Sequence, residues 1–187
     1  MDDDSDLVDA VEAYDPLFGA WTQVASLPAA RHHHTAAVVD GKIYVVGGIF
    51  HDDEGEKVAT GLVEMYDPAA DSWQQMAAMP TVRHSHASAV MDGKIYVSGG
   101  FTTLGELSDA FEAYDPVTNT WATLASLSEV RVDHASAAFN GKLYVFGGYA
   151  PGADRMDLVE VYSPASNSWA RAADMPWAID EVVAVAL

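Results

Sequence analysis

The residues best suited to chemistry in this sequence are histidines and arginines that gather in three short segments. Several imidazoles held around one opening could bind a transition metal. However, every segment begins with an arginine and ends with a histidine three residues later, and a feature shared by all copies favours a structural role. We therefore predict no metal here and expect partner specificity at the two variable positions in between. The segments are Arg31-His32-His33-His34, Arg83-His84-Ser85-His86 and Arg131-Val132-Asp133-His134.

A second candidate for chemistry is an acidic loop at residues 51–56. The carboxylates of Asp52, Asp53 and Glu54 could ligate a hard cation such as calcium. Their spacing matches no defined calcium-binding loop, and a run of acidic residues is more often a solvated surface. We therefore predict a solvated loop without a metal or other cofactor, and calcium at these three residues is the alternative.

The segments belong to a larger repeat with a period of about 50 residues. A tyrosine recurs four times, each time followed seven residues later by a tryptophan, and three of the tyrosines are preceded by a glycine pair. Aligning the copies places Asp180 with His32 and His84, and Glu181 with His33, Ser85 and Asp133. The anchors are Tyr14, Tyr66, Tyr114 and Tyr162; Trp21, Trp73, Trp121 and Trp169; and Gly47-Gly48, Gly99-Gly100 and Gly147-Gly148.

Each full copy has the pattern of four short strands. Small residues, such as those at 35–39, predict an innermost strand, because blades that converge on an axis leave little room there. An Asp-Gly or Asn-Gly pair then predicts a two-residue hairpin turn, as at Asp40-Gly41. The glycine pair ends the second strand, and the tyrosine and tryptophan mark the third and outer strands. Such units predict the blades of a β-propeller.

A hydrophobic run, then Gly-Gly, then Tyr, six further residues and Trp: this pattern resembles the Kelch repeat over almost the whole chain. The resemblance implies an all-β propeller of four-stranded antiparallel blades, with three complete blades and a split or partial fourth. We expect a single domain spanning residues 1–187. Its parts are a partial blade at 1–30, blades at 31–80, 81–128 and 129–176, and the inner strand of a further or shared blade at 177–187.

The partial blades leave the closure of the ring open. Pairing the two ends in one blade would still lack one strand, and exposed strand edges promote association. One alternative is a piece that needs more blades from the same or another chain, which includes a homo-oligomer that completes the propeller. The other is a closed four-bladed monomer.

In Kelch proteins the loops after each glycine pair and before each inner strand crowd one face, where partners often bind. The resemblance therefore implies a protein-interaction module. For three of the arginines the alternative is that they brace neighbouring blades. The candidate contacts are Arg31, His32, His33, Arg83, His84, Ser85, Arg131, Asp133 and Arg155.

Two other functions fit the resemblance. One is a carbohydrate-binding or sugar-isomerising, mutarotase-like propeller, and the other is a self-assembling propeller fragment. Copper-dependent sugar oxidases of the Kelch type use a cysteine-modified tyrosine, and this chain has no cysteine. No pair of residues stands out as catalytic, so we favour binding over catalysis.

Charge and composition limit the classes of partner that the sequence predicts. The chain has 28 acidic and 9 basic residues, a formal charge of −19. Such a field repels phosphate backbones and anionic lipids, so we expect a protein partner and neither nucleic acid nor membrane. The excess of aspartate resembles proteins adapted to high salt. Residues 1–6 lack the basic start and apolar middle of a signal peptide, which favours a soluble, cytoplasmic protein.

Overall fold

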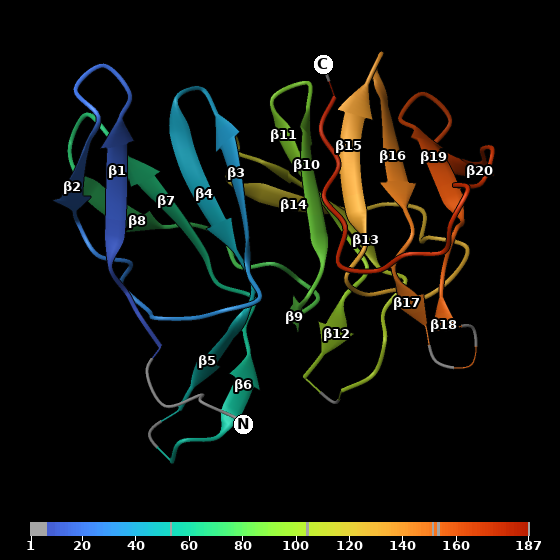
Figure 1. Cartoon of the computed structure of the whole chain (residues 1–187), viewed down its shortest axis with the longest axis horizontal. Helices are drawn as coiled ribbons and strands as arrows, with labels where there is room; N and C mark the ends of the chain where they lie inside the picture. Colours follow the sequence, from blue (N-terminus) through green and yellow to red (C-terminus); the bar gives the residue numbers. More distant parts are fainter. Residues whose placement is uncertain (1–6, 53, 104, 151, 153, 187) are drawn as a thin grey trace.

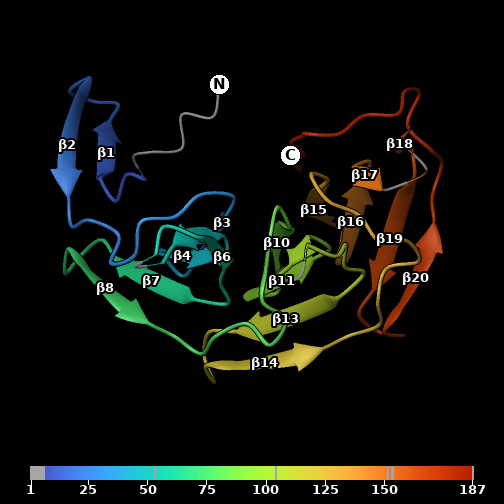
Figure 2. The same ribbon diagram turned by 90° about the horizontal axis from the view of Figure 1, so that it is seen from below.

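The computed structural model describes residues 7–52, 54–103, 105–150, 152 and 154–186. These residues form only strands, turns and loops, and Figure 1 shows three four-stranded antiparallel sheets standing side by side. Seen from below, the sheets form an open arc with their outer strands on the perimeter (Figure 2). Residues of the inner strands line a hollow on the inside of the arc, which we call the channel. The arc confirms the all-β propeller predicted from the repeat.

The three sheets fall in the ranges 31–80, 81–128 and 129–176, which we call blades 2, 3 and 4. Blade 2 contains β3 (Thr35–Val39), β4 (Lys42–Val46), β7 (Val63–Asp67) and β8 (Ser72–Gln75). Blade 3 contains β10 (Ala87–Met91), β11 (Lys94–Ser98), β13 (Phe111–Asp115) and β14 (Thr120–Thr123). Blade 4 contains β15 (Ala135–Phe139), β16 (Lys142–Phe146), β19 (Val159–Ser163) and β20 (Ser168–Arg171). The hairpin of β1 (Val11–Asp15) and β2 (Ala20–Val24) is the half-blade.

Three small two-stranded sheets, which the repeat pattern did not predict, lie together at the lower end in Figure 1. Each contains the loop that follows a glycine pair. They are β5 (Ile49–His51) with β6 (Lys57–Ala59), β9 (Arg83–His84) with β12 (Phe101–Thr102), and β17 (Tyr149–Ala150) with β18 (Asp154–Arg155).

The predicted hairpin turns are confirmed at the opposite end of the blades. In the turn between β3 and β4, Asp40 and Gly41 have φ of 49° and 73°. Two successive positive φ angles match the right-handed twist of the flanking strands, and Asp, Asn and Gly tolerate them best. The same geometry recurs at Asp92-Gly93 and Asn140-Gly141.

The glycine pairs lie where backbone and side chains of neighbouring segments come closest. A Cβ added to Gly47, which has φ of 63°, would lie 2.6 Å from His86 Cε1 and 2.7 Å from the Arg83 carbonyl oxygen of the next blade. A Cβ on Gly48 would lie 2.7 Å from the His32 carbonyl oxygen of its own blade. Only glycine fits both the angle and the space. The pairs in blades 3 and 4, Gly99-Gly100 and Gly147-Gly148, are equally crowded.

The hydrophobic core lies between the blades. One cluster joins Tyr44 and Val46 of blade 2 to Ile95 and Tyr114 of blade 3. The tyrosine rings of neighbouring blades meet at this boundary, with centroids 6.0 Å apart for Tyr44 and Tyr114. The next boundary repeats the contact between Tyr96 and Tyr162 at 6.3 Å. Aromatic rings thus pack against each other across both of these blade boundaries.

Hydrogen bonds on the perimeter add a second link between blades. The indole Nε1–H of Trp121 donates to the Ala77 carbonyl at 2.9 Å, and Asn119 Oδ1 accepts from the Ala77 N–H at 2.8 Å. The same Oδ1 accepts from the Tyr114 hydroxyl at 2.8 Å, which fixes the ring. Trp73 with Asp71 and Ala25, and Trp169 with Asn167 and Ala125, form equivalent links.

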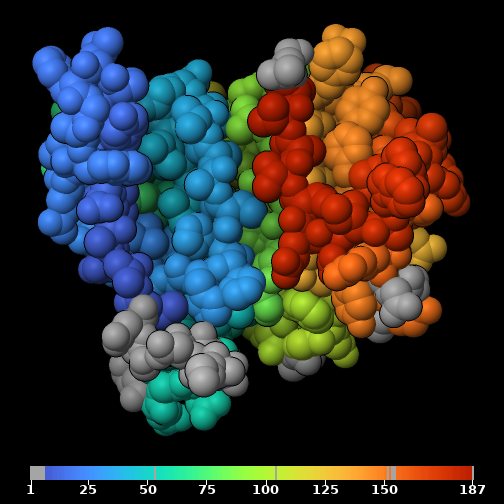
Figure 3. Space-filling view, viewed as in Figure 1, coloured from blue at the N-terminus to red at the C-terminus, as the bar shows by residue number. Residues whose placement is uncertain are grey.

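Residues 182–186, within the segment 177–187 that we predicted to be the inner strand of a further or shared blade, form no strand in the described chain. The segment is nevertheless attached to blade 4, since the Glu181 N–H donates to the Asp133 carbonyl at 2.8 Å. A strand needs a neighbour to pair its backbone groups, and the described chain places none beside 182–186. Figure 3 shows this segment lying along the front of the molecule beside blade 4. Leu187 lies outside the described residues.

We predict that Gly99→Ala destabilises the fold more than Gly93→Ala. Both glycines have positive φ, of 61° and 72°, but a Cβ at Gly99 would lie 2.5 Å from the Arg131 carbonyl oxygen, whereas nothing lies within 4 Å of Gly93. In urea unfolding, Gly93→Ala should lower the free energy of unfolding by about 1 kcal/mol and Gly99→Ala by about 3 kcal/mol. Equal losses would contradict the close-approach explanation.

Candidate functional site

Each complete blade contains a buried arginine paired with a buried glutamate. In blade 3, Arg83 Nη2 donates to Glu112 Oε2 at 2.6 Å, and Nη1 donates to the carbonyls of Ala110 and Gly99 at 2.6 and 3.1 Å. Burial lowers the pKa of Arg83, and Glu112 opposes this shift. The pair fastens the entry of the inner strand to the third strand. Arg31 with Glu64 and Arg131 with Glu160 repeat it, both at 2.5 Å.

This burial corrects the prediction that Arg31, Arg83 and Arg131 contact a partner. All three side chains are 0% exposed, so a partner cannot reach the guanidinium groups of the folded blades. The guanidinium group of each arginine braces its own blade. Arg83 is linked to the preceding blade through its backbone, because its carbonyl accepts the Gly48 N–H at 3.2 Å.

The residues between the shared arginine and histidine form a hydrogen-bonded chain across the blades, which we call the channel mouth. The Ser85 N–H donates to the His33 carbonyl at 3.0 Å, the Asp133 N–H to the Ser85 carbonyl at 3.2 Å, and the Glu181 N–H to the Asp133 carbonyl at 2.8 Å. All four residues have φ between 52° and 55°. The mouth thus presents four different side chains on one backbone geometry.

One side of the mouth is rich in imidazoles. The rings of His33 and His84 lie 6.0 Å apart, and His32 and His33 contact each other through Nδ1. His84 also stacks on Phe101 of β12, with centroids 5.4 Å apart and an interplanar angle of 27°. Burial, followed by repulsion from His33 and His32, lowers the pKa of His84 to about 4. His84 is therefore neutral at physiological pH and offers a flat stacking surface.

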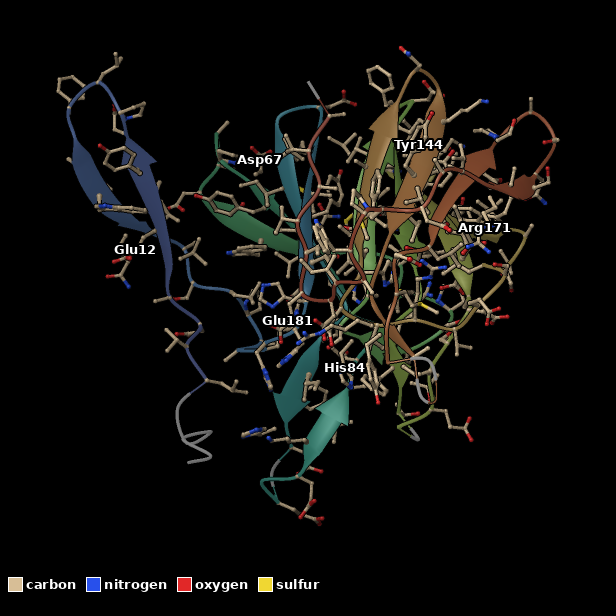
Figure 4. The ribbon with its side chains drawn as sticks, turned by 45° about the vertical axis from the view of Figure 1, so that its right-hand side comes forward. Glu12, Asp67, His84, Tyr144, Arg171 and Glu181 are labelled. Carbon is tan, nitrogen blue, oxygen red and sulfur yellow. The ribbon has the colours of Figure 1, made fainter. Side chains whose placement is uncertain are left out.

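The other side of the mouth is acidic. Burial raises the pKa of Asp133, and the nearby carboxylates of Glu181 and Asp180 raise it further, while His33 and Ser85 oppose the shift. Arg155 of β18 lies at the rim, where its Nε is 2.7 Å from Asp180 Oδ1 and its side chain is 65% exposed. Figure 4 labels one residue from each side of the mouth, His84 and Glu181.

Next to the mouth, along the first residues of the inner strands, the channel contains a cavity of about 330 Å³. His86 and His134, each 5% exposed, line it together with Ser88 and Ser136. The Nε2 atoms of the two histidines contact Thr35 Oγ1 at 3.1 Å and Ser98 Oγ at 2.9 Å. Burial lowers the pKa of both imidazoles, that of His134 to about 3. The shared histidines of blades 3 and 4 are therefore neutral groups, and each contacts a hydroxyl group of the preceding blade.

The structure brings five of the predicted contacts together at or beside the mouth, and a sixth, Arg155, lies at its rim. The five are His32, His33, His84, Ser85 and Asp133. The contact list from the sequence missed Phe101, Asp180 and Glu181. The alignment of the copies held a signal for the two acids, because they occupy the variable positions, whereas no repeat pattern indicates the stacking of Phe101 on His84.

The acidic loop has a local structural role. Asp52 Oδ1 accepts from the backbone N–H groups of Glu54 and Glu56 at 3.0 and 2.9 Å, which closes the turn between β5 and β6. Asp53 lies outside the described residues. Within the part of the chain that the structure describes, no three His, Cys, Asp or Glu residues are grouped so that they could hold a metal ion.

Comparison with protein families agrees with this geometry. The model described as Attractin/LZTR1 beta-propeller matches residues 1–106, more than half of the chain, and the Kelch motif model matches residues 131–176. The chain belongs to the Kelch-repeat β-propeller family. Across the described residues, no helix is long and apolar enough to cross a membrane.

Kelch relatives match about half of the chain. It is 46% identical over 92 residues to Kelch-like protein terF of Aspergillus terreus, covering 48% of this chain and 20% of that protein. It is 43% identical over 106 residues to human Kelch-like protein 34, covering 56% and 16% respectively. Beta-scruin of Limulus polyphemus is 40% identical over 83 residues, covering 44% and 9%. The chain thus spans a fifth or less of the length of these relatives.

The solved structure titled "Structure of YjhT" superimposes with a TM-score of 0.77 at 22% identity, covering 86% of this chain and 57% of that chain. At this identity the likeness shows the fold alone. The Kelch propeller of this chain corresponds to a little over half of that structure.

We predict that Arg83→Met destabilises the Kelch fold strongly, because it leaves the Glu112 carboxylate buried without its partner. The free energy of unfolding should fall by roughly 3–5 kcal/mol. Lys94→Met is the matched control, since the Lys94–Asp115 pair at 2.8 Å is partly exposed, and this change should cost less than about 1 kcal/mol. Equal, small losses in urea titrations would contradict a bracing role.

We predict that His84 and His134 stay neutral well below pH 6. In NMR spectra of histidine-labelled protein they should titrate near the pKa values of about 4 and about 3. Since both pKa values lie below the usual 6.5, the unfolded chain binds more protons, so stability falls as the pH drops from about 6.5 toward 4. Midpoints near 6.5 would show that these imidazoles are hydrated.

Proposed function

We propose that this Kelch propeller is a protein-interaction module whose partner binds at the channel mouth. The observation that carries the proposal is the set of four equivalent positions, His33, Ser85, Asp133 and Glu181, which share one backbone geometry but differ in side chain. A rigid frame with variable side chains suits recognition, because the contacts are set before binding. Membership of a family rich in Kelch-like proteins supports the same function.

The two sides of the mouth suit a partner segment of mixed character. The carboxylates of Asp133 and Glu181 favour a lysine or arginine of the partner. The stacked pair of His84 and Phe101 favours a flat apolar or aromatic side chain. We therefore propose an extended segment that places a basic residue next to an aromatic one.

A display library of random peptides, selected on the purified chain, tests this proposal. We expect enriched peptides to combine a basic and an aromatic residue, and Asp133→Asn with Glu181→Gln should weaken their binding about tenfold or more in calorimetry. Asp92→Asn is the matched control, because it also removes a carboxylate but lies in a turn at the opposite end of blade 3. Equal affinities for both variants would overturn the assignment of the mouth.

The alternative function, carbohydrate binding or sugar isomerisation, is favoured by one observation. The cavity of about 330 Å³ next to the mouth is of small-molecule size and is lined by His86, His134, Ser88 and Ser136. Calorimetry with a panel of monosaccharides and polarimetry of their anomers test it directly. Binding or accelerated mutarotation that is lost in Ser136→Val would favour this alternative over the peptide module.

A further inference from the structure

The face of blade 4 that points away from blade 3, which we call its trailing face, carries one exposed and two half-buried aromatic side chains. Phe139, Tyr144 and Phe146 occupy the strand positions that Val39, Tyr44 and Val46 occupy in blade 2. Phe139 is 48% exposed, whereas Val39 is 5% exposed because blade 3 covers it. A cavity of about 390 Å³ lies over the three aromatic residues, and residues 184–186 form its other wall.

The half-blade exposes the side chains that, in blades 3 and 4, contact the preceding blade. Tyr14 is 52% and Trp21 66% exposed, whereas the equivalent Tyr66 of blade 2 is 6% exposed. The two exposed rings nevertheless keep the arrangement of the buried pairs, with centroids 5.0 Å apart and an interplanar angle of 43°. For Tyr114 and Trp121 in blade 3 these values are 5.1 Å and 41°. The half-blade is therefore already shaped for a blade-to-blade contact.

The internal boundaries show which contacts such a face makes. At each, a tyrosine of the second strand meets the next blade's anchor tyrosine, as Tyr44 meets Tyr114 and Tyr96 meets Tyr162. If a further boundary followed the same rule, Tyr144 in the second strand of blade 4 would meet Tyr14, the anchor tyrosine of the half-blade.

The tryptophan links continue in the same way. Trp121 donates to the Ala77 carbonyl and Trp169 to the Ala125 carbonyl. The next position in that series is Ala173, which pairs with Trp21. Figure 2 places the half-blade and blade 4 at opposite ends of the arc, so within one chain these pairs cannot form.

We propose that copies of this chain associate head to tail, with the half-blade of one copy packed on the trailing face of blade 4 of the next. This contact is separate from the channel mouth and continues the two blade boundaries inside the chain. Because the two patches differ, the interface is heterologous and builds rings or open chains of copies.

Two features make the proposed contact weaker than an internal boundary. Gly19 stands where Asp71, Asn119 and Asn167 accept an N–H from the preceding blade, so one hydrogen bond of the series is lost. The charge of −19 on each copy also opposes association until salt screens it. We therefore expect reversible association that strengthens with protein and salt concentration.

Complementary variants test the interface. Trp21→Asp removes the half-blade contact and Tyr144→Asp removes the contact of blade 4, so each variant alone should be monomeric in sedimentation and light scattering where the wild type associates. Mixed together, they retain one intact pair of faces and should form a dimer of one copy each and nothing larger. Phe139→Asp is a second variant for blade 4, at a half-exposed position that the fold should tolerate.

Val117→Asp is the matched control, because Val117 is 87% exposed at a hairpin turn away from both faces and should leave association unchanged. A wild type that stays monomeric at all concentrations and salts overturns the proposal. Variants that associate like the wild type, or a mixture that forms no dimer, overturn it as well.

Discussion

The close approach of the blades at their glycine pairs is the constraint on which the other features of this propeller depend. At Gly99 the Arg131 carbonyl and the His134 ring of the next blade lie where a Cβ would be. This contact holds the inner strand of the next blade at the wall of the channel. It also places the tyrosines of neighbouring blades in one hydrophobic core. Because the spacing is set by backbone atoms, it is the same at both internal boundaries and leaves side chains elsewhere free to vary.

The channel mouth follows from this constraint. The entry residues of successive blades are close enough for one N–H to reach the preceding carbonyl, as Ser85 reaches His33 at 3.0 Å. The buried arginine and glutamate then hold each entry segment against its own blade, as Arg83 and Glu112 do. Shared polar residues thus provide the frame, and the residues between them provide the surface.

The sequence was sufficient to predict the fold because each residue pattern that the fold requires occurs in several copies of the repeat. The glycine pairs, the turns such as Asp92-Gly93 and the aromatic anchors each have one physical explanation, and the structure agrees with it. The site was predicted only in part. Variable positions indicated Ser85 and Asp133, but repetition alone could not tell a surface arginine from a buried one, because the glutamate that pairs with Arg83 lies 29 residues away.

The segment that follows blade 4 differs from the repeat at the position of the buried arginine. Ile179 occupies the place of Arg83 and Arg131, since its carbonyl also accepts the N–H of a second glycine, Gly148, at 2.9 Å. Its side chain is 42% exposed, and among the described residues no glutamate lies in position to pair with an arginine there. An arginine at this position would lack the carboxylate that pairs with Arg83 and Arg131, whereas isoleucine needs no such partner. Blade 4 thus keeps the apolar side chains of a blade boundary on its open face, while the segment that follows it lacks the arginine that braces a complete blade.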